Sequence, residues 1–138
     1  MAIMTSRMDE SVFHALRRAM QEHGARWQAK LPGLTKPQYA VLVAISETPG
    51  LDQASAGQRA ATDKATLANL LLRLEERGLI TRTVGTDRRR RELRLTPAGE
   101  ELLATATPVV DRVNESMLAP LDDEERRRLV ALLTKLAL

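Results

Sequence analysis

Cysteine is absent from this chain of 138 residues, and histidine occurs only twice. Without a thiol the protein can form no disulfide, no thiolate metal site, no cysteine nucleophile and no thiol-based redox switch. Two histidines, His14 and His23, are too few for a histidine-rich metal cluster. We therefore expect neither a metal nor any other cofactor.

Long apolar runs are missing as well. No stretch of 18 or more apolar residues occurs, so the sequence predicts no membrane-spanning helix. The N-terminal residues lack the apolar core and small-residue cleavage site of a secretory signal, and we expect a cytoplasmic protein. Catalytic patterns are equally scarce. No Ser/His/Asp set, paired carboxylates or phosphate-binding loop stands out, which argues against an enzyme and leaves no catalytic residue to name.

Basic charge is concentrated in the middle of the chain. Between Arg59 and Arg94 there are ten basic and five acidic residues, a net charge of +5, whereas the whole chain carries +3. A basic centre with slightly acidic flanks is typical of a protein that binds a phosphate backbone. A solvated charged surface would give the same count, so charge alone leaves both interpretations open.

Apolar residues at three- and four-residue steps predict an amphipathic helix over residues 8–30, ended by Pro32-Gly33. Thr35-x-x-Gln38 is a capping box that opens the next helix. The predicted helices that follow cover residues 36–47, 53–60 and 64–77, and two more open at Thr96-Pro97 and at Asp122-x-x-Glu125. Pro108 should kink the fifth helix or end it early.

After Gly78 the periodicity changes from helical to alternating, which predicts strands over residues 79–84 and 92–95. The turn between them carries Asp87 and the run Arg88–Arg91. The predicted fold is therefore mainly α: a winged helix-turn-helix with a two-stranded β-wing between N- and C-terminal helices. Four adjacent arginines repel one another unless a polyanion is near, and a projecting basic tip suits insertion into a narrow minor groove. Asp87 could hold the loop by pairing with a following arginine.

The segment 53–77 has the layout of a helix-turn-helix, whose second helix presents its N-terminal residues to base edges in the major groove. Lys64 can donate to guanine, Asn69 can pair with adenine, and the Thr66 methyl can meet the methyl of thymine. Leucines 67, 70, 71 and 74 recur on the opposite side of this helix. Seen alone, the segment would also fit an ordinary capped surface helix.

Three motifs carry a resemblance to a known family: LTKPQYAVL at residues 34–42, LRLEERGLITR at 72–82 and DRRRRELRLTPAG at 87–99. Together they resemble the MarR family of winged helix-turn-helix transcriptional regulators. The resemblance implies recognition-helix roles for Lys64, Thr66 and Asn69 and a phosphate contact for Arg73. Arg88, Arg89 and the adjacent Arg90 are the implied minor-groove residues of the wing. One departure is the third helix, where small residues (Ala56, Gly57, Ala60 and Thr62) replace the larger apolar ones usual in the family.

The resemblance extends over essentially the whole chain and implies one MarR-type domain, residues 1–138. Residues 34–99 would form the DNA-binding lobe, and residues 8–31 and 98–138 the dimerisation helices. The terminal helices carry longer apolar stripes than a chain of this size can easily bury, which favours a homodimer. Two recognition helices related by a two-fold axis would read a near-palindromic operator in double-stranded DNA.

A small-molecule site is the last expectation. Residues of the first two helices resemble family members that sense aromatic acids, and the candidates are Arg17, Arg18, His23, Trp27 and Tyr39. An arginine could clamp a carboxylate, and a histidine could bind a phenol. Trp27 could equally be core, and both arginines could be surface charges. We thus expect a repressor released by a small aromatic carboxylate or phenol; the alternatives are a non-specific architectural DNA binder, a ligand-independent regulator or a protein-interaction module.

Overall fold

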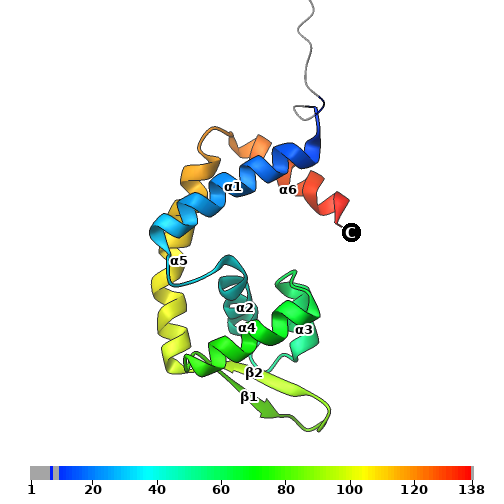
Figure 1. Ribbon diagram of the computed structural model, residues 1–138, viewed down its shortest axis with the longest axis vertical. Coiled ribbons are helices and arrows are strands. Elements are labelled where there is room, and N and C mark those ends of the chain that lie inside the picture. Colours follow the sequence, from blue (N-terminus) through cyan, green and yellow to red (C-terminus); the bar gives the residue numbers. More distant parts are fainter. Residues whose placement is uncertain (1–6, 8–9, 138) are drawn as a thin grey trace, which may run out of the picture. The chain divides into compact units, whose positions relative to one another are not determined.

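The computed structural model describes Arg7 and residues 10–137, and its element order confirms the predicted fold class (Figure 1). The elements are α1 (Val12–Lys30), α2 (Lys36–Glu47), α3 (Gln53–Arg59), α4 (Lys64–Glu76), β1 (Ile80–Val84), β2 (Arg91–Leu95), α5 (Pro97–Leu118) and α6 (Asp123–Leu136). No helix in the described part of the chain is long and apolar enough to cross a membrane. The chain divides into two compact units, Leu31–Pro108 and the combination of Met1–Lys30 with Val109–Leu138.

The unit Leu31–Pro108 has a closed apolar core. Its largest fully buried side chains come from α2, α4 and both strands: Val41, Leu42, Ile45, Leu71, Leu74, Ile80 and Leu93. In α4 the buried positions 67, 70, 71 and 74 follow the helical repeat, so one face packs inward and the other stays in solvent. This division leaves the polar face of α4 available for a partner.

Local side-chain hydrogen bonds fix where the helices of this unit begin. The capping box of Thr35 and Gln38 is present at the start of α2. Asp52 caps α3, and Asp63 caps α4 by accepting a hydrogen bond from the Thr66 backbone N–H. Each cap satisfies an N–H group that has no partner within its helix. The predicted boundaries of these helices are therefore confirmed to within one residue.

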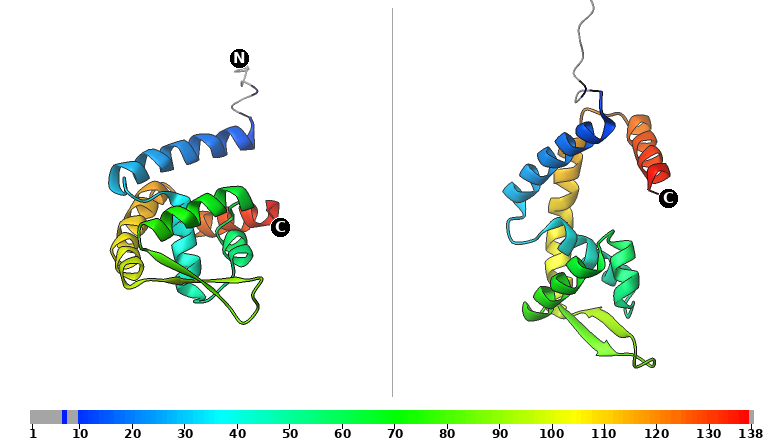
Figure 2. Two further views of the ribbon diagram at one scale, coloured as in Figure 1. Left: turned by 60° about the horizontal axis from the view of Figure 1, so that its bottom comes forward. Right: turned by 45° about the vertical axis from the view of Figure 1, so that its right-hand side comes forward.

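The hairpin pairs β1 with β2 in antiparallel register, with Arg82 opposite Leu93. Its base is anchored by the chain before α3, because Leu93 donates to the Leu51 carbonyl at 3.0 Å and accepts from Gly50 N–H at 2.8 Å. The hairpin reaches beyond the helices of its own unit in both views of Figure 2. This is the predicted wing, with each strand shifted by one residue at its start.

The other unit contains α1, the C-terminal part of α5 and α6. Helix α1 begins at Val12 rather than near Met8, which lies outside the described residues. Helix α5 runs on through Pro108, so the helix does not end early. Hydrogen bonds from α1 to α5 join His23 Nε2 to Asn114 Oδ1 at 2.7 Å and Arg26 Nη1 to Ser116 Oγ at 2.8 Å.

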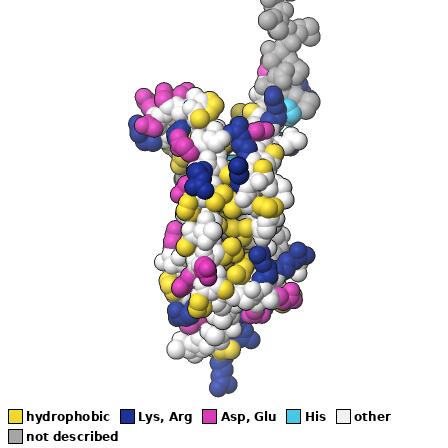
Figure 3. Space-filling view, turned by 90° about the vertical axis from the view of Figure 1, so that its left-hand side faces the viewer, with side chains coloured by type: hydrophobic (Ala, Val, Ile, Leu, Met, Phe, Trp, Pro, Cys, Tyr) yellow, Lys and Arg dark blue, Asp and Glu magenta, His cyan; other side chains and the backbone are white. Residues whose placement is uncertain are grey.

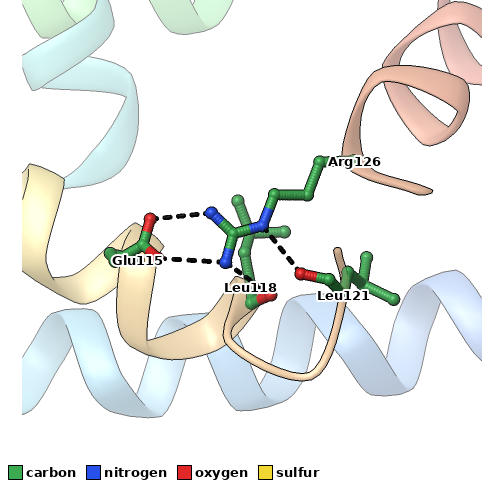
Figure 4. Close-up of polar contacts among 4 residues, drawn as sticks. All are labelled: Glu115, Leu118, Leu121 and Arg126. Carbon is green, nitrogen blue, oxygen red and sulfur yellow. Dashed lines mark hydrogen bonds and ion pairs between the residues drawn. The ribbon is translucent and has the colours of Figure 1, made fainter. Parts of the chain in front are cut away.

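A single arginine holds the turn between α5 and α6 (Figure 4). Arg126 donates to both carboxylate oxygens of Glu115, at 2.8 and 3.0 Å, and to the carbonyl oxygens of Leu118 and Leu121. Its guanidinium thereby links the last residue of α5 to the turn that precedes α6. The neighbouring guanidinium lowers the pKa of the Glu115 carboxyl below its ordinary value.

Candidate nucleic-acid interface

The outward face of α4 carries the residues that the sequence assigns to base recognition. Lys64, Thr66, Asn69 and Arg73 are all exposed. The Thr66 hydroxyl lies 2.8 Å from Asp63 Oδ2, so this side chain also takes part in the cap. Hydrogen bonds from Thr66 lower the pKa of Asp63 below its ordinary value. The start of α4 is thus fixed while its donors remain accessible.

Helix α3 packs against α4 through small residues. Ala56 and Gly57 are both buried, and a Cβ on Gly57 would lie 3.0 Å from Leu67 Cδ2 and 3.3 Å from the Thr62 carbonyl oxygen. The absence of larger apolar side chains in α3 therefore allows a close approach between the two helices. The turn between them contains Ala61 in the left-handed region, with φ of 51°.

A groove of about 880 Å³ lies between α3, the start of α4 and the wing. Lys64 and Ala68 line it from α4, and Arg89, Arg90 and Arg91 line it from the wing. Figure 3 shows basic side chains, in dark blue, projecting at the bottom, where the hairpin of Figure 1 lies. The fold thus brings together basic groups that lie more than twenty residues apart in the sequence. Asn69, Arg73 and Arg88 do not line this groove, although all three are exposed.

The four arginines of the wing are not equivalent. Arg90 Nη1 lies 3.5 Å from Asp52 Oδ2, whereas Arg88 and Arg89 are exposed and form no ion pair within the described residues. Asp87 accepts a hydrogen bond from the Arg89 backbone N–H at 3.0 Å. Asp87 therefore holds the loop through the backbone and not through a guanidinium, which leaves the Arg88 and Arg89 side chains free to extend.

Sequence reasoning missed the contacts at the base of the wing. Arg82 in β1 donates to both carboxylate oxygens of Glu75, at 3.1 and 3.2 Å, and to Gln53 Oε1 at 3.4 Å. These hydrogen bonds lower the pKa of Glu75. The sequence showed Arg82 only as a charged residue in an alternating strand. Its partners could not be identified, because they lie 7 and 29 positions away in the chain.

The ligand candidates lie in both units. In α1 the His23 and Trp27 rings have centroids 6.0 Å apart, and Trp27 is buried. Asn114, which sequence reasoning did not single out, joins this pair through His23. Tyr39 belongs to the other unit, where its hydroxyl lies 3.1 Å from Thr107 Oγ1.

The two candidate arginines of α1, Arg17 and Arg18, are exposed and form no ion pair in the part of the chain that the structure describes. At 100° per residue, Arg18 lies on the opposite side of α1 from Trp27, while Arg17 lies about 80° from it. A groove that Arg18 lines with Ala15, Glu22 and Ala25 follows that opposite side. Within α1, Arg17 is thus the better placed of the two to share a ligand with His23 and Trp27.

Comparison with known proteins identifies the family. A model of the MarR family matches residues 33–90. The transcriptional regulator HosA of Escherichia coli O157:H7 is 48% identical over 125 residues, which cover 90% of this chain and 93% of HosA. The chain belongs to the MarR family. It is a winged helix-turn-helix, DNA-binding transcriptional regulator and not an enzyme.

Two solved structures of regulators with this fold match the chain over nearly its full length. The PcaV regulator of Streptomyces coelicolor, in complex with its natural ligand, has a TM-score of 0.92 at 34% identity and covers 98% of this chain and 97% of its own. BpsR of Bordetella bronchiseptica, whose DNA binding is regulated by 6-hydroxynicotinic acid, has a TM-score of 0.91 at 31% identity and covers 97% of this chain and 98% of its own.

Proposed function

We propose that this regulator is a sequence-specific repressor that binds a near-palindromic operator as a homodimer and releases it when a small aromatic carboxylate or phenol binds. The observation that carries the DNA half is the groove between α4 and the wing. Lys64 lines this groove together with Arg89, Arg90 and Arg91 of the wing, and the remaining polar residues of α4 are exposed outside it. A helix face for the major groove and a basic tip for the minor groove are the two elements that operator binding needs.

The dimer follows from the terminal helices. Large apolar side chains are exposed on α1 (Val12, Phe13 and Met20) and on α6 (Leu129, Val130, Leu132, Leu133 and Leu136). Exposed apolar surface of this extent marks an interaction site on soluble proteins. A second copy offers the same face, so the contact closes with two-fold symmetry and places two α4 helices on successive half-sites, about 10 base pairs apart.

The effector half rests on α1 and on the relatives. His23 and Trp27 supply a polar ring and an apolar ring side by side, and His23 Nδ1 is buried without a hydrogen-bond partner among the described residues. Arg17 supplies a cation for the carboxylate. The regulation of BpsR by 6-hydroxynicotinic acid supports an aromatic acid as the class of ligand.

The DNA half is tested by selecting a binding site from random DNA and comparing two variants on it. Asn69→Ala should weaken binding by about 1–3 kcal/mol at the selected site and relax the base preference at one position. Arg89→Ala should weaken binding evenly across sequences and lower the dependence on salt by about one phosphate contact. Arg128→Ala, an exposed change in α6, is the control. Selection that returns no symmetric site would favour the architectural binder instead.

The effector half is tested by calorimetry with benzoate-, hydroxybenzoate- and cinnamate-type acids. Arg17→Ala should abolish or greatly weaken binding, and Arg18→Ala, on the opposite side of α1, is its matched control. By linkage, an acid that lowers DNA affinity must bind the free protein more tightly than the DNA complex, by the same factor. Binding unchanged in both variants would place the carboxylate elsewhere. No binding by any of these acids would make the protein a ligand-independent regulator.

A further inference from the structure

The wing and the recognition helix are joined by one side chain, Arg82. Its guanidinium contacts Glu75 in the last turn of α4 with two hydrogen bonds and Gln53, the first residue of α3, with a third. Three elements of the helix-turn-helix unit therefore meet at one group. The Arg82 side chain is 25% exposed, against 67% for Arg90 in the wing tip, so Arg82 is largely enclosed by these partners.

All three nitrogens of this guanidinium donate a hydrogen bond to a neighbouring side chain. Nε and Nη2 form a fork on the Glu75 carboxylate, and Nη1 points toward Gln53 Oε1. A planar, bidentate pair of this kind fixes orientation as well as distance, which a single point charge cannot do. Arg82 thus differs from Arg88 and Arg89, whose side chains extend without an ion pair among the residues described.

The backbone around Arg82 makes the same connection. Arg82 pairs across the hairpin with Leu93, which is fully buried and hydrogen-bonded to Gly50 and Leu51. Toward the tip, Asp52 caps α3 with one oxygen and faces Arg90 with the other. The hairpin is consequently held against the chain that leads into α3, and among the described residues only Arg82 connects it to α4 by a charged pair.

We propose that Arg82 is a positioning residue for DNA binding: with Glu75 and Gln53 it sets the wing at a fixed angle to the recognition helix, and it does not itself contact DNA. The proposal rests on the proposed function, in which α4 and the wing bind one duplex together. A wing that is already oriented loses less conformational freedom on binding, so the affinity gained comes from preorganisation. At positions 75 and 82, operator affinity should then depend less on the charge of each residue than on whether the two residues pair.

The direction in which operator affinity changes distinguishes positioning by Arg82 from a simple effect of charge. Glu75→Arg adds positive charge to a DNA-binding surface, so an electrostatic effect alone would tighten binding. If Arg82 positions the wing, Glu75→Arg breaks the pair, puts two guanidiniums together and weakens binding. Arg82→Glu should weaken it as well. The double variant Glu75→Arg/Arg82→Glu restores the pair with reversed polarity and the same net charge, and the Gln53 amide can then donate to the new carboxylate.

The experiment measures operator affinity and its salt dependence for the full chain and these three variants, with thermal unfolding as a check on folding. Each single variant should lose about tenfold in affinity, and the double variant should recover most of it, as expected for residues in direct contact. The salt dependence of Arg82→Lys, which keeps the charge but not the fork, should match wild type while its affinity falls. That of Arg89→Ala should be shallower.

Tighter binding by Glu75→Arg, or no recovery in the double variant, would overturn the proposal. If a single variant fails to fold, Arg82→Lys still decides: affinity equal to wild type would remove the positioning role. The proposed function is contradicted by a different result, namely that the wild-type protein has no preferred DNA site. Wing contacts with phosphates would persist in that case, and the recovery in the double variant could still be measured on any duplex.

Discussion

The helices of the two units carry similar apolar repeats but differ in how many of these side chains are buried. In the unit Leu31–Pro108, helices α2 and α4 each bury four side chains. Helix α6, with leucines at the same helical spacing, buries none, and Leu136 is 64% exposed. The difference lies in the surroundings, because the wing and three helices enclose the first core while α6 lacks such a cover within one chain. The apolar residues of the unit Leu31–Pro108 are thus covered within one chain, whereas those of α6 are left exposed.

The largest expected effect tests the closed core. A Cβ on Gly99 would lie 2.0 Å from the Leu79 carbonyl oxygen, a backbone atom that cannot swing aside. Gly99→Ala should therefore destabilise the protein by about 3 kcal/mol or more, the upper range for overpacking. Denaturant unfolding measures it. Gly33→Ala is the matched control, since nothing lies within 4 Å of a Cβ there. Equal stability of the two variants would mean that the start of α5 can move away from β1.

The second prediction tests the open face of α6. If the face stays in solvent, Leu132→Ser should change stability by no more than about 0.5 kcal/mol, as for ordinary surface positions. If a second copy covers it, the change should cost about 2 kcal/mol per chain and shift the protein toward monomer. We expect the second outcome by light scattering and concentration-dependent unfolding. Arg127→Ser, on the side of α6 away from Leu132, should alter neither measurement. A wild-type monomer at micromolar concentration would contradict the homodimer.

The same comparison explains what could be predicted from the sequence. Caps and periodicity are local, so the capping box at Thr35 and the apolar repeats placed the helices of the unit Leu31–Pro108 correctly. The outward direction of Lys64 and Asn69 followed from the leucine repeat. Contacts between distant residues could not be read in this way. Arg82 with Glu75 and Gln53, and His23 with Asn114, meet only after the chain has folded.

Two further details depended on the energies of particular contacts, which the apolar periodicity of the sequence does not reveal. The path of α5 through Pro108 was uncertain because one lost hydrogen bond can be offset by packing along a helix of 22 residues. Arg90 was indistinguishable from its neighbours in the run of four arginines until its distance to Asp52 was known. The residues assigned to DNA and effector binding stay predictions, and the variants proposed above test them.

A smaller effect is expected in the turn between α3 and α4. Ala61 has φ of 51°, the left-handed region that costs a residue with a Cβ about 1 kcal/mol relative to glycine. Ala61→Gly should therefore stabilise the DNA-binding unit by up to about 1 kcal/mol, less the entropy that glycine adds to the unfolded chain. Thermal unfolding measures the change, and Ala65→Gly, in the first turn of α4, should destabilise instead. A loss of stability in Ala61→Gly would show that the flexibility of the unfolded chain outweighs the relief of strain.

The smallest effect concerns acid pH and compares one ion pair from each unit. Arg126 lowers the pKa of Glu115 below 4.5, and Arg82 does the same for Glu75. A carboxyl with a lowered pKa in the folded state stabilises the protein above its unfolded pKa, and this contribution is lost as the pH falls through the folded value. The difference in unfolding free energy between wild type and Glu115→Gln should thus be constant at neutral pH and shrink below pH 4.5. Glu75→Gln should behave likewise. Denaturant unfolding at pH values down to about 3 measures both. No difference between wild type and Glu115→Gln at any pH would mean that Arg126 holds the turn through the carbonyls of Leu118 and Leu121 alone.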